Sequence, residues 1–376
     1  MQPRLSASLP PLIMGTATFN AQYNKDPFTL PTSQLIHQAL DNGIRAFDTS
    51  PYYGPAEDLL GQALCSAQYP RSSYHLLTKV GRVGEASFDY SPAWIRKSVQ
   101  RSLQRLRTDY LDVVYCHDVE FVSSADQVVE AVKELRRLRD QRGGLVRYIG
   151  ISGYPVHVLV DLAERILHDT GEPLDVVMSY ANYTLQNIRL LHQGLRRLVD
   201  RAGVDVVLNA SPLGMGLLRR DGVPVGGMGD FHPAPTGLRD AVQKANEWLV
   251  NNNNNSNDGK IEVLAIRFAL GSWLRHGAEA GAMGLIPFSA ITRRGKRLGG
   301  SVLGVSNLDE LYETLNVWRE AINGLDDLDH ILTLAQGIRE VLGPWFDYTW
   351  PSPPLDFVNS LSPEHLALKE SMPDLL

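Results

Sequence analysis

Four residues with proton-transfer chemistry lie at the ends of short apolar runs or just beyond them. Asp48, Lys79 and His117 each close such a run, and Tyr53 follows Asp48 by five positions on a predicted loop. An acid, an ammonium, an imidazole and a phenol are groups that general acid–base catalysis uses. The pattern therefore predicts a site that moves a proton, provided that the fold brings the three run ends together.

The acid–base properties of these four side chains suggest a separate role for each of them in proton transfer. A free tyrosine titrates at about pH 10, which is too high for an efficient general base near neutrality. We expect Lys79, placed within hydrogen-bond reach, to favour the phenolate and lower the pKa of Tyr53. Asp48 would keep the lysine charged and oriented, and His117 would hold a substrate hydroxyl or carbonyl oxygen. Such a site would transfer a proton at an oxygen while another group carries a hydride.

Short apolar segments alternate with amphipathic stretches along most of the chain. The Asp-Val-Val-Tyr and Asp-Val-Val-Met runs that begin at Asp112 and Asp175 are typical of strands buried on both faces, as in a parallel sheet. We predict strands at residues 12–17, 44–48, 75–80, 111–117, 146–151, 174–178, 204–209 and 301–304. We predict the accompanying helices at residues 32–43, 56–64, 94–106, 124–139, 156–168, 188–201 and 307–320.

Eight strand–helix units in one chain favour an α/β fold of the (β/α)8 TIM-barrel type over an open sheet. A doubly wound Rossmann fold is the competitor, but the sequence contains no G-x-G-x-x-G motif. The carboxyl ends of barrel strands meet at one mouth, so Asp48, Lys79 and His117 are expected to converge there.

The interval between the seventh and eighth strands is long and irregular. It holds a Gly-rich loop, two predicted helices at 238–250 and 261–274, and the asparagine tract 251–259, which we interpret as a disordered surface insert. Residues 281–300 form a second expected insert, whose basic patch 293–297 is interpreted as a solvated loop and whose residues 285–288 rival the eighth strand.

The whole chain, 1–376, is expected to form a single barrel domain with its core at about residues 12–320. In the C-terminal extension 321–376, a helix at 328–341 and an irregular proline-rich tail are expected to cover the outside of the barrel.

Composition narrows the classes of function. A formal net charge of −6 leaves no basic footprint for nucleic acid. No run approaches the roughly 18 apolar residues of a membrane span, and no signal peptide is recognised, so a cytoplasmic protein is expected. Two cysteines cannot build a disulfide framework, and the sulfur of Cys116 should face away from His117 because adjacent strand residues alternate sides. The remaining histidines lack ligand spacing, so no metal site is predicted.

The strand ends carry motifs that resemble the signatures of the aldo-keto reductases. Asp48-Thr-Ser-Pro-Tyr-Tyr53-Gly, Thr-Lys79-Val and Leu-Asp-x-x-x-x-His117 are similar to three family motifs and stand in the family's order, within a similarity that covers about residues 12–320. The resemblance implies a (β/α)8 barrel, a nicotinamide cofactor bound without a Rossmann motif, and Asp48, Tyr53, Lys79 and His117 as the catalytic residues. Tyr52 is the alternative phenol, but the family's tyrosine directly precedes glycine, as Tyr53 does.

The resemblance also implies contacts with the cofactor's nicotinamide and pyrophosphate. Ser152 matches a strand-five serine that binds the carboxamide, although the asparagine that follows it in the family is Gly153 here. The usual strand-six glutamine falls near Ser179 or Tyr180, and the usual stacked tyrosine is replaced by Ala210. Cofactor packing is therefore expected to differ locally. The pyrophosphate is expected at the backbone of residues 213–216, which include Leu213 and Gly214, and Ser211 on the same strand-seven loop is also expected to bind the cofactor.

At the adenosine end, Gly304 and Glu310 match the family's strand-eight loop and the start of the following helix. Members that prefer NADP have an arginine where this chain has Glu310. A carboxylate would repel a 2′-phosphate and could accept hydrogen bonds from ribose hydroxyls. NAD is therefore the expected cofactor, with NADP possible.

Within the family, residues 178–183 and 209–218 are most similar to sugar dehydrogenases that oxidise D-arabinose or L-galactose. This resemblance implies NAD-dependent oxidation of an aldose at C1 to its lactone, with D-arabinose to D-arabinono-1,4-lactone as the expected reaction and Tyr53 as general acid/base. An NADPH-dependent aldehyde or ketone reductase is the alternative enzyme. A cofactor-sensing binding protein, like the potassium-channel β-subunits that share this barrel, is the alternative from another class.

Overall fold

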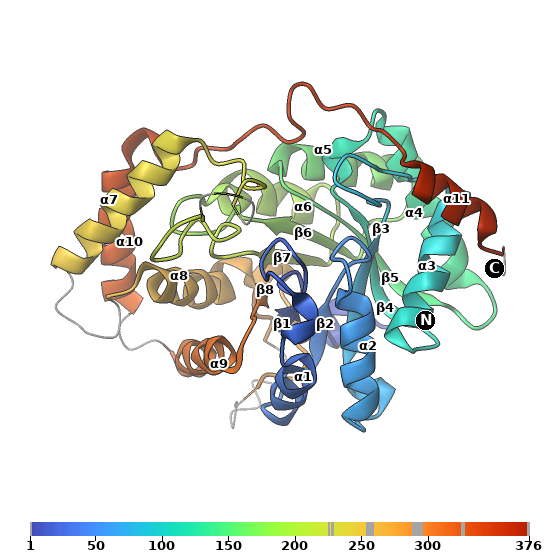
Figure 1. Cartoon of the computed structure of the whole chain (residues 1–376), viewed down its shortest axis with the longest axis horizontal. Coiled ribbons are helices and arrows are strands. Elements are labelled where there is room, and N and C mark those ends of the chain that lie inside the picture. The colour runs from blue at the N-terminus through green and yellow to red at the C-terminus, as the bar shows by residue number, and fades with distance from the viewer. Residues whose placement is uncertain are drawn as a thin grey trace.

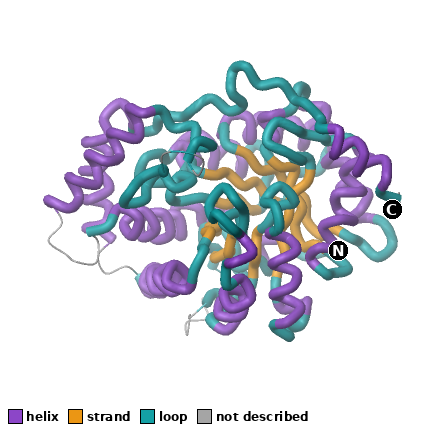
Figure 2. Tube along the Cα trace, viewed as in Figure 1, coloured by secondary structure: helices purple, strands orange, loops and turns teal. Residues whose placement is uncertain are grey.

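The computed structural model describes residues 2–224, 226, 229–252, 259–287, 296–324 and 328–373. Eight parallel strands close into a barrel in sequence order, and the last strand pairs with the first, from Leu12 opposite Ser301 to Gly15 opposite Gly304. Figures 1 and 2 show the strands at the centre with helices around them. The strands are β1 (Leu12–Gly15), β2 (Ala46–Asp48), β3 (His75–Val80), β4 (Leu111–His117), β5 (Val146–Gly153), β6 (Val176–Tyr180), β7 (Val206–Ala210) and β8 (Gly300–Gly304).

The helices follow the predicted positions closely and complete a (β/α)8 barrel. Helix α3 shows why the local sequence forms one: Ser91 caps its start, Pro92 occupies the first turn, and Arg107 ends it in a left-handed conformation. The covering helices are α1 (Thr32–Asp41), α2 (Ala56–Ser66), α3 (Pro92–Leu106), α4 (Ala125–Asp140), α5 (Val156–Thr170), α6 (Arg196–Asp200), α8 (Ile261–His276) and α9 (Leu308–Asn323). Three others are α7 (Thr236–Asn252), α10 (Leu328–Leu342) and α11 (Pro363–Ser371).

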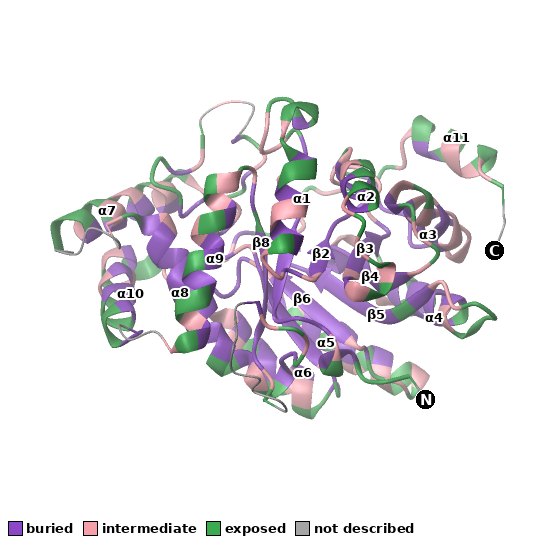
Figure 3. Cartoon of the chain, turned by 90° about the horizontal axis from the view of Figure 1, so that it is seen from below, coloured by how far each residue is buried: buried purple, intermediate pink, exposed green. Residues whose placement is uncertain are grey.

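Successive side chains along each strand point to opposite faces of the sheet, which builds one apolar layer inside the barrel and one beneath the helices. On β4, Val113 and Tyr115 point into the barrel, whereas Val114 and Cys116 pack between the sheet and the helices. The sulfur of Cys116 therefore lies away from the imidazole of His117, as the alternation predicted. Figure 3 shows the strands mostly buried, with exposed residues on the outer faces of the helices.

The predicted helix at 188–201 differs from the structure in its first half. Residues Leu190–Leu195 form a π-helical turn before α6 begins. The chain entering this turn is held by Asp347, whose carboxylate accepts a hydrogen bond from the Ile188 amide at 2.8 Å. The Leu190 amide bonds the carbonyl of Asn182 at 3.0 Å. These anchors fix where the turn starts independently of the helix that follows.

The described parts of the predicted insert, residues 281–287 and 296–299, lie between α8 and β8 beneath the barrel. Ala282 pairs with Leu298, and the amides of Met283 and Gly284 bond the carbonyls of Ser6 and Leu9. Helix α8 is thus the barrel's own helix between β7 and β8, and α7 is the added element, packed beside α10 (Figure 1). Residues 285–287 form no strand. Of the predicted disordered insert 251–259, residues 251 and 252 are instead the last residues of α7, and residues 253–258 lie outside the described residues, as do residues 293–295 of the basic patch.

The C-terminal segment takes a course that the sequence did not indicate. The expectation that it covers the outside of the barrel holds for α10 and α11 but is wrong for residues 350–358, which line the cavity at the barrel mouth. Trp350 stacks on Tyr154 with ring centroids 4.5 Å apart, and Phe357 packs edge-on against Phe88 and Phe121. Figure 1 shows this red segment passing over the barrel from α10 to α11, which lies beside α3. Packing against aromatic side chains at the barrel mouth holds residues 350–358 in this position.

Helix α11 is held by a buried ion cluster. The Asp89 carboxylate, 6% exposed, accepts a hydrogen bond from Lys369 Nζ at 2.7 Å and contacts His365 Nε2 at 3.0 Å. The ring of His365 packs edge-on against Trp94 at 4.3 Å between centroids. Burial alone would raise the pKa of Asp89, but the hydrogen bonds from Lys369, Ser91 and His365 lower it. The Asp89 carboxylate is therefore an ionic anchor for α11.

In the described part of the chain, no helix is long and apolar enough to cross a membrane.

Replacing Asp89 by alanine should release α11 while leaving the barrel folded. Loss of the carboxylate leaves His365 and Lys369 without their acceptor, which should favour local opening by about 2 kcal/mol. We expect roughly thirtyfold faster hydrogen exchange in α11 and unchanged protection in β3 and β4. The matched control is Glu370→Ala, an exposed acid on the same helix. Equal exchange in both variants would contradict the anchoring role.

Candidate active site

The four residues singled out in the sequence meet at the carboxyl end of the barrel. Asp48 ends β2, Lys79 lies one residue before the end of β3, and His117 ends β4, while Tyr53 lies on the loop between β2 and α2. All four line one cavity of about 1300 Å³. Parallel strands in register deliver these side chains to the same edge.

Asp48 and Lys79 form a buried ion pair at the base of this cavity. The Lys79 ammonium lies 2.6 Å from Oδ1 of Asp48 and donates a second hydrogen bond to the carbonyl of Thr49 at 2.8 Å. Lys79 is 1% exposed and Asp48 3%. Burial raises the pKa of Asp48, and the charge and hydrogen bond of Lys79 oppose that rise. Two of the three N–H donors of the Lys79 ammonium are thus used in hydrogen bonds to Asp48 and Thr49. The Lys79 nitrogen lies 5.0 Å from the ring centroid of Tyr53.

The acid–base state of Tyr53 differs from the sequence-based expectation. Its pKa is raised well above 10, first by burial and then by the charges of Asp48 and Asp118. The expectation that Lys79 would lower this pKa is wrong, because the lysine directs its hydrogen bonds to Asp48 and Thr49. With its pKa raised, Tyr53 is a proton donor.

His117 is buried and neutral. Burial lowers the pKa of its imidazole to about 3. Its Nδ1 lies 3.1 Å from the Ser50 hydroxyl, and its Nε2 lies 3.4 Å from Oδ2 of Asp118. A proton on Nε2, facing the carboxylate, satisfies both contacts, with Ser50 donating to Nδ1. The rings of Tyr53 and His117 meet edge-on with centroids 5.8 Å apart.

Asp118 and Arg82 extend the site beyond the four predicted residues. Arg82 lies 2.5 Å from Oδ2 of Asp118, and its guanidinium stacks 3.7 Å above the ring centroid of Tyr52. Burial would raise the pKa of Asp118, but the positive charge of Arg82 and its hydrogen bond hold that pKa low. Sequence reasoning missed this pair, although Asp118 directly follows β4 and Arg82 lies two residues beyond β3, so the position of both charges near strand ends could have identified them.

Five of the six residues that the resemblance assigned to the cofactor line the same cavity. They are Ser152, Ser211, Leu213, Gly304 and Glu310. Gly214 is set back from the wall: its carbonyl accepts a hydrogen bond from Nε2 of His232 at 2.9 Å, and it turns the chain at φ +58°. Tyr180 and Ala210, the departures noted in the sequence, also line the cavity.

Gly153, where the family has asparagine, has a structural explanation. A Cβ atom at this position would lie 2.4 Å from Oε2 of Glu120. Oε1 of Glu120 accepts hydrogen bonds from the Tyr154 amide and the Ser352 hydroxyl, each at 3.0 Å. Burial and the neighbouring Asp118 raise the pKa of Glu120 to about 8. A carboxyl group that secures the C-terminal segment thus occupies the space of the missing side chain.

Glu310 has a structural role that the sequence analysis did not assign. Asn307 caps α9 by accepting a hydrogen bond from the Glu310 amide at 2.9 Å, and the Glu310 carboxylate accepts one from the Ser306 amide at 2.7 Å. This reciprocal arrangement resembles a capping box, except that the carboxylate accepts from the amide one residue before the cap residue. Glu262 lines the same end of the cavity, and its buried Oε2 has no hydrogen-bond partner in the described part of the chain.

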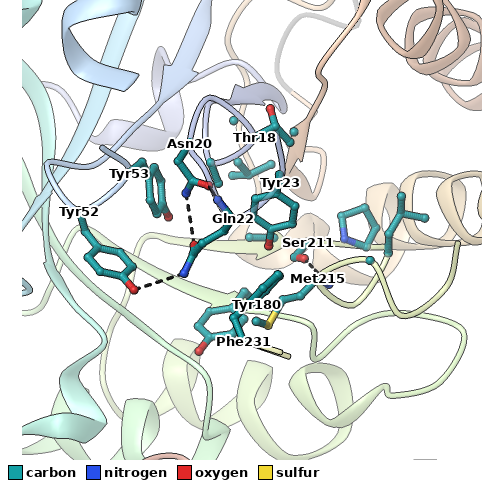
Figure 4. Close-up of a pocket in the computed structure, with 18 of the residues that line it drawn as sticks. Thr18, Asn20, Gln22, Tyr23, Tyr52, Tyr53, Tyr180, Ser211, Met215 and Phe231 are labelled. Carbon is teal, nitrogen blue, oxygen red and sulfur yellow. Dashed lines mark hydrogen bonds between the residues drawn. The ribbon is translucent and has the colours of Figure 1, made fainter. Parts of the chain in front are cut away.

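These features fit an extended dinucleotide. The cavity runs from the four residues to the start of α9, and Gly216 and Gly304 line it where backbone can approach a ligand closely. The unsatisfied oxygen of Glu262 is an acceptor suited to a ribose hydroxyl. In Figure 4 the labelled side chains of Thr18, Tyr23, Tyr180, Ser211 and Met215 surround this space.

Comparison with known proteins agrees with the geometry. Residues 11–329 match the model of the aldo/keto reductase family. The chain belongs to the aldo-keto reductases. Family membership makes it an NAD(P)-dependent oxidoreductase that acts on small molecules.

Two curated relatives are sugar dehydrogenases. The chain is 40% identical to D-arabinose 1-dehydrogenase of Saccharomyces cerevisiae over 314 residues, which cover 82% of this chain and 83% of the relative. It is 33% identical to L-galactose dehydrogenase of Arabidopsis thaliana over 320 residues, 84% of this chain and 86% of the relative.

Solved structures share the fold at low identity. The holo form of an aldo-keto reductase from Bacillus halodurans has a TM-score of 0.60 at 22% identity, covering 90% of this chain and 95% of that one. A glycerol dehydrogenase from Gluconobacter oxydans has a TM-score of 0.59 at 20% identity, covering 92% and 94%.

The pKa directions of Tyr53 and His117 predict an asymmetric pH dependence. A protonated Tyr53 is ready to donate, so kcat/KM for carbonyl reduction should be flat between about pH 6 and pH 9. Alcohol oxidation needs the phenol to lose its proton, so its kcat/KM should rise with pH over the same range, by up to about tenfold per pH unit. Because His117 titrates at about 3, neither profile should show a histidine transition near neutrality. A transition near pH 6.5 in both directions would contradict these assignments.

Proposed function

We propose that the protein oxidises an aldose at C1 to its lactone with NAD as cofactor, and that D-arabinose, converted to D-arabinono-1,4-lactone, is the favoured substrate. The observation that carries the chemistry is the buried Asp48–Lys79 pair beside Tyr53 and His117 at one cavity. Support for the substrate comes from the 40% identity to a D-arabinose 1-dehydrogenase over four fifths of both chains.

In this proposal each of the four residues acts at the oxygen on C1. Tyr53, as the phenolate, takes the proton from the C1 hydroxyl and becomes a phenol, and the Lys79 charge, 5.0 Å from its ring centroid, favours the phenolate that must form first. Asp48 holds the lysine charged and in place. His117, neutral and oriented by Ser50, donates its Nε2 proton to the same oxygen in place of the 3.4 Å contact with Asp118.

The nicotinamide cofactor, when bound, supplies the hydride acceptor. Ser152 would hold its carboxamide, and the backbone at Ser211 and Leu213 would meet its phosphates. Gly304 and Glu310 would hold its adenosine end. The selectivity for NAD rests on Glu310, because its carboxylate is fixed by Ser306 and would repel a 2′-phosphate.

One observation favours a second candidate, NADPH-dependent reduction of an aldehyde or ketone. The raised pKa of Tyr53 makes its hydroxyl a better proton donor than acceptor. Both reactions use the same four residues, so the preferred cofactor separates them.

The deciding experiment is NADH formation across a panel of aldoses, with NAD and NADP compared in parallel. We expect D-arabinose, L-galactose or L-fucose to be oxidised with NAD. Tyr53→Phe should lower kcat by about 100-fold to 10,000-fold, because it removes the proton-transfer group, while NAD binding, followed by fluorescence, persists. Absence of activity on every aldose would move the function to carbonyl reduction, and full activity of Tyr53→Phe would exclude the proposed mechanism.

Glu310→Gln should relax the preference for NAD. Glutamine keeps an acceptor for the Ser306 amide, so the helix cap survives while the negative charge is lost. We expect the ratio of NADPH to NADH dissociation constants to fall by roughly fivefold to tenfold. Glu370→Gln, an exposed charge change on α11, is the control. An unchanged ratio would remove Glu310 as the selectivity determinant.

A further inference from the structure

Tyr52 lies next to the candidate catalytic tyrosine but has a different environment. Its ring centroid is 6.3 Å from that of Tyr53 and 6.1 Å from that of His117. All three residues line the cavity. Figure 4 shows the hydroxyls of Tyr52 and Tyr53 pointing into the same space. Any substrate held by Tyr53 and His117 therefore passes close to Tyr52.

The acceptor capacity of the Tyr52 hydroxyl is already used. Arg82 donates a hydrogen bond to this oxygen at 2.9 Å, and Gln22 Nε2 donates another at 3.4 Å. A phenol has one proton and two acceptor positions, so only the proton is left. In the described part of the chain, no acceptor for that proton is found.

Both donors are held in place by further contacts. Asn20 Nδ2 donates to Oε1 of Gln22 at 3.3 Å, which leaves the amide nitrogen of Gln22 facing Tyr52. Arg82 is fixed by Asp118 at 2.5 Å and by stacking on the Tyr52 ring at 3.7 Å. Because a cationic donor polarises the hydroxyl that it bonds, Arg82 strengthens Tyr52 as a hydrogen-bond donor.

We propose that Tyr52 donates its hydroxyl proton in a hydrogen bond to the substrate oxygen on the carbon next to the reacting one, the C2 hydroxyl of an aldose. Tyr53 and His117 define the place of the C1 oxygen, and Tyr52 flanks both rings, where the neighbouring oxygen of a vicinal pair falls. The Tyr52 hydroxyl thereby selects substrates that carry a hydroxyl on the carbon next to the reacting one. This inference rests on the proposed sugar oxidation.

A matched pair of sugars tests it. D-Arabinose and 2-deoxy-D-ribose differ only by the hydroxyl at C2, so wild type and Tyr52→Phe form a double-mutant cycle with them. We expect Tyr52→Phe to lower kcat/KM for D-arabinose by about tenfold and to leave 2-deoxy-D-ribose within about twofold. Tyr69→Phe, which removes an exposed hydroxyl bonded to Asp41, should change neither.

Other outcomes overturn the inference. An equal loss on both sugars would make Tyr52 a packing residue that supports Arg82, and no loss on either would remove it from substrate binding. Binding of NADH, followed by fluorescence, reports whether the variant is folded.

A second pair separates this inference from the proposed function. Reduction of glycolaldehyde and acetaldehyde compares the same C2 hydroxyl without an aldose. Failure to oxidise any aldose would reject the sugar oxidation, while loss of selectivity between the two aldehydes in Tyr52→Phe would still support the role of Tyr52.

Discussion

The buried ion pair between Asp48 and Lys79 can form only in the strand register that the barrel has. Two charges almost wholly removed from water are tolerated only when they meet at short distance with their remaining hydrogen bonds satisfied. Here the ammonium lies 2.6 Å from the carboxylate and also bonds a backbone carbonyl, and the parallel register of β2 and β3 sets that distance. A slip of one residue in either strand would turn one charge toward the apolar layer beneath the helices. The site and the sheet are therefore specified together.

Around this pair, the cavity wall is assembled from polar groups that constrain one another. Asp118 contacts His117 on one side and Arg82 on the other, and Arg82 in turn bonds Tyr52. Each member satisfies a donor or acceptor that burial would otherwise leave costly. The result is a polar wall that adjoins the aromatic rings of Phe88 and Phe121, on which Phe357 packs.

The sequence predicted the barrel, its strand order and the convergence of three strand ends, because parallel strands buried on both faces have an unmistakable apolar pattern. Helix α8 was recognised, but its place as the seventh barrel helix was not, since the connection beneath the barrel at Ala282 and Leu298 depends on pairing between distant residues. The raised pKa of Tyr53 was missed for a related reason: it depends on burial and on where Lys79 directs its hydrogen bonds. The course of residues 350–358 left no local signal, because irregular proline-rich segments are positioned by the surface they meet.

The crossing of the mouth by residues 350–358 has an evolutionary consequence. The segment is fixed at Trp350 on one side and through α11 on the other, while Leu355 between them is 99% exposed. Changes in its middle cost little folding energy, since they disturb neither anchor nor barrel. The middle of this segment can thus change its side chains without disturbing the strand-end residues beneath it. A protein with this architecture could thus acquire new substrates while keeping Asp48, Lys79 and His117 unchanged.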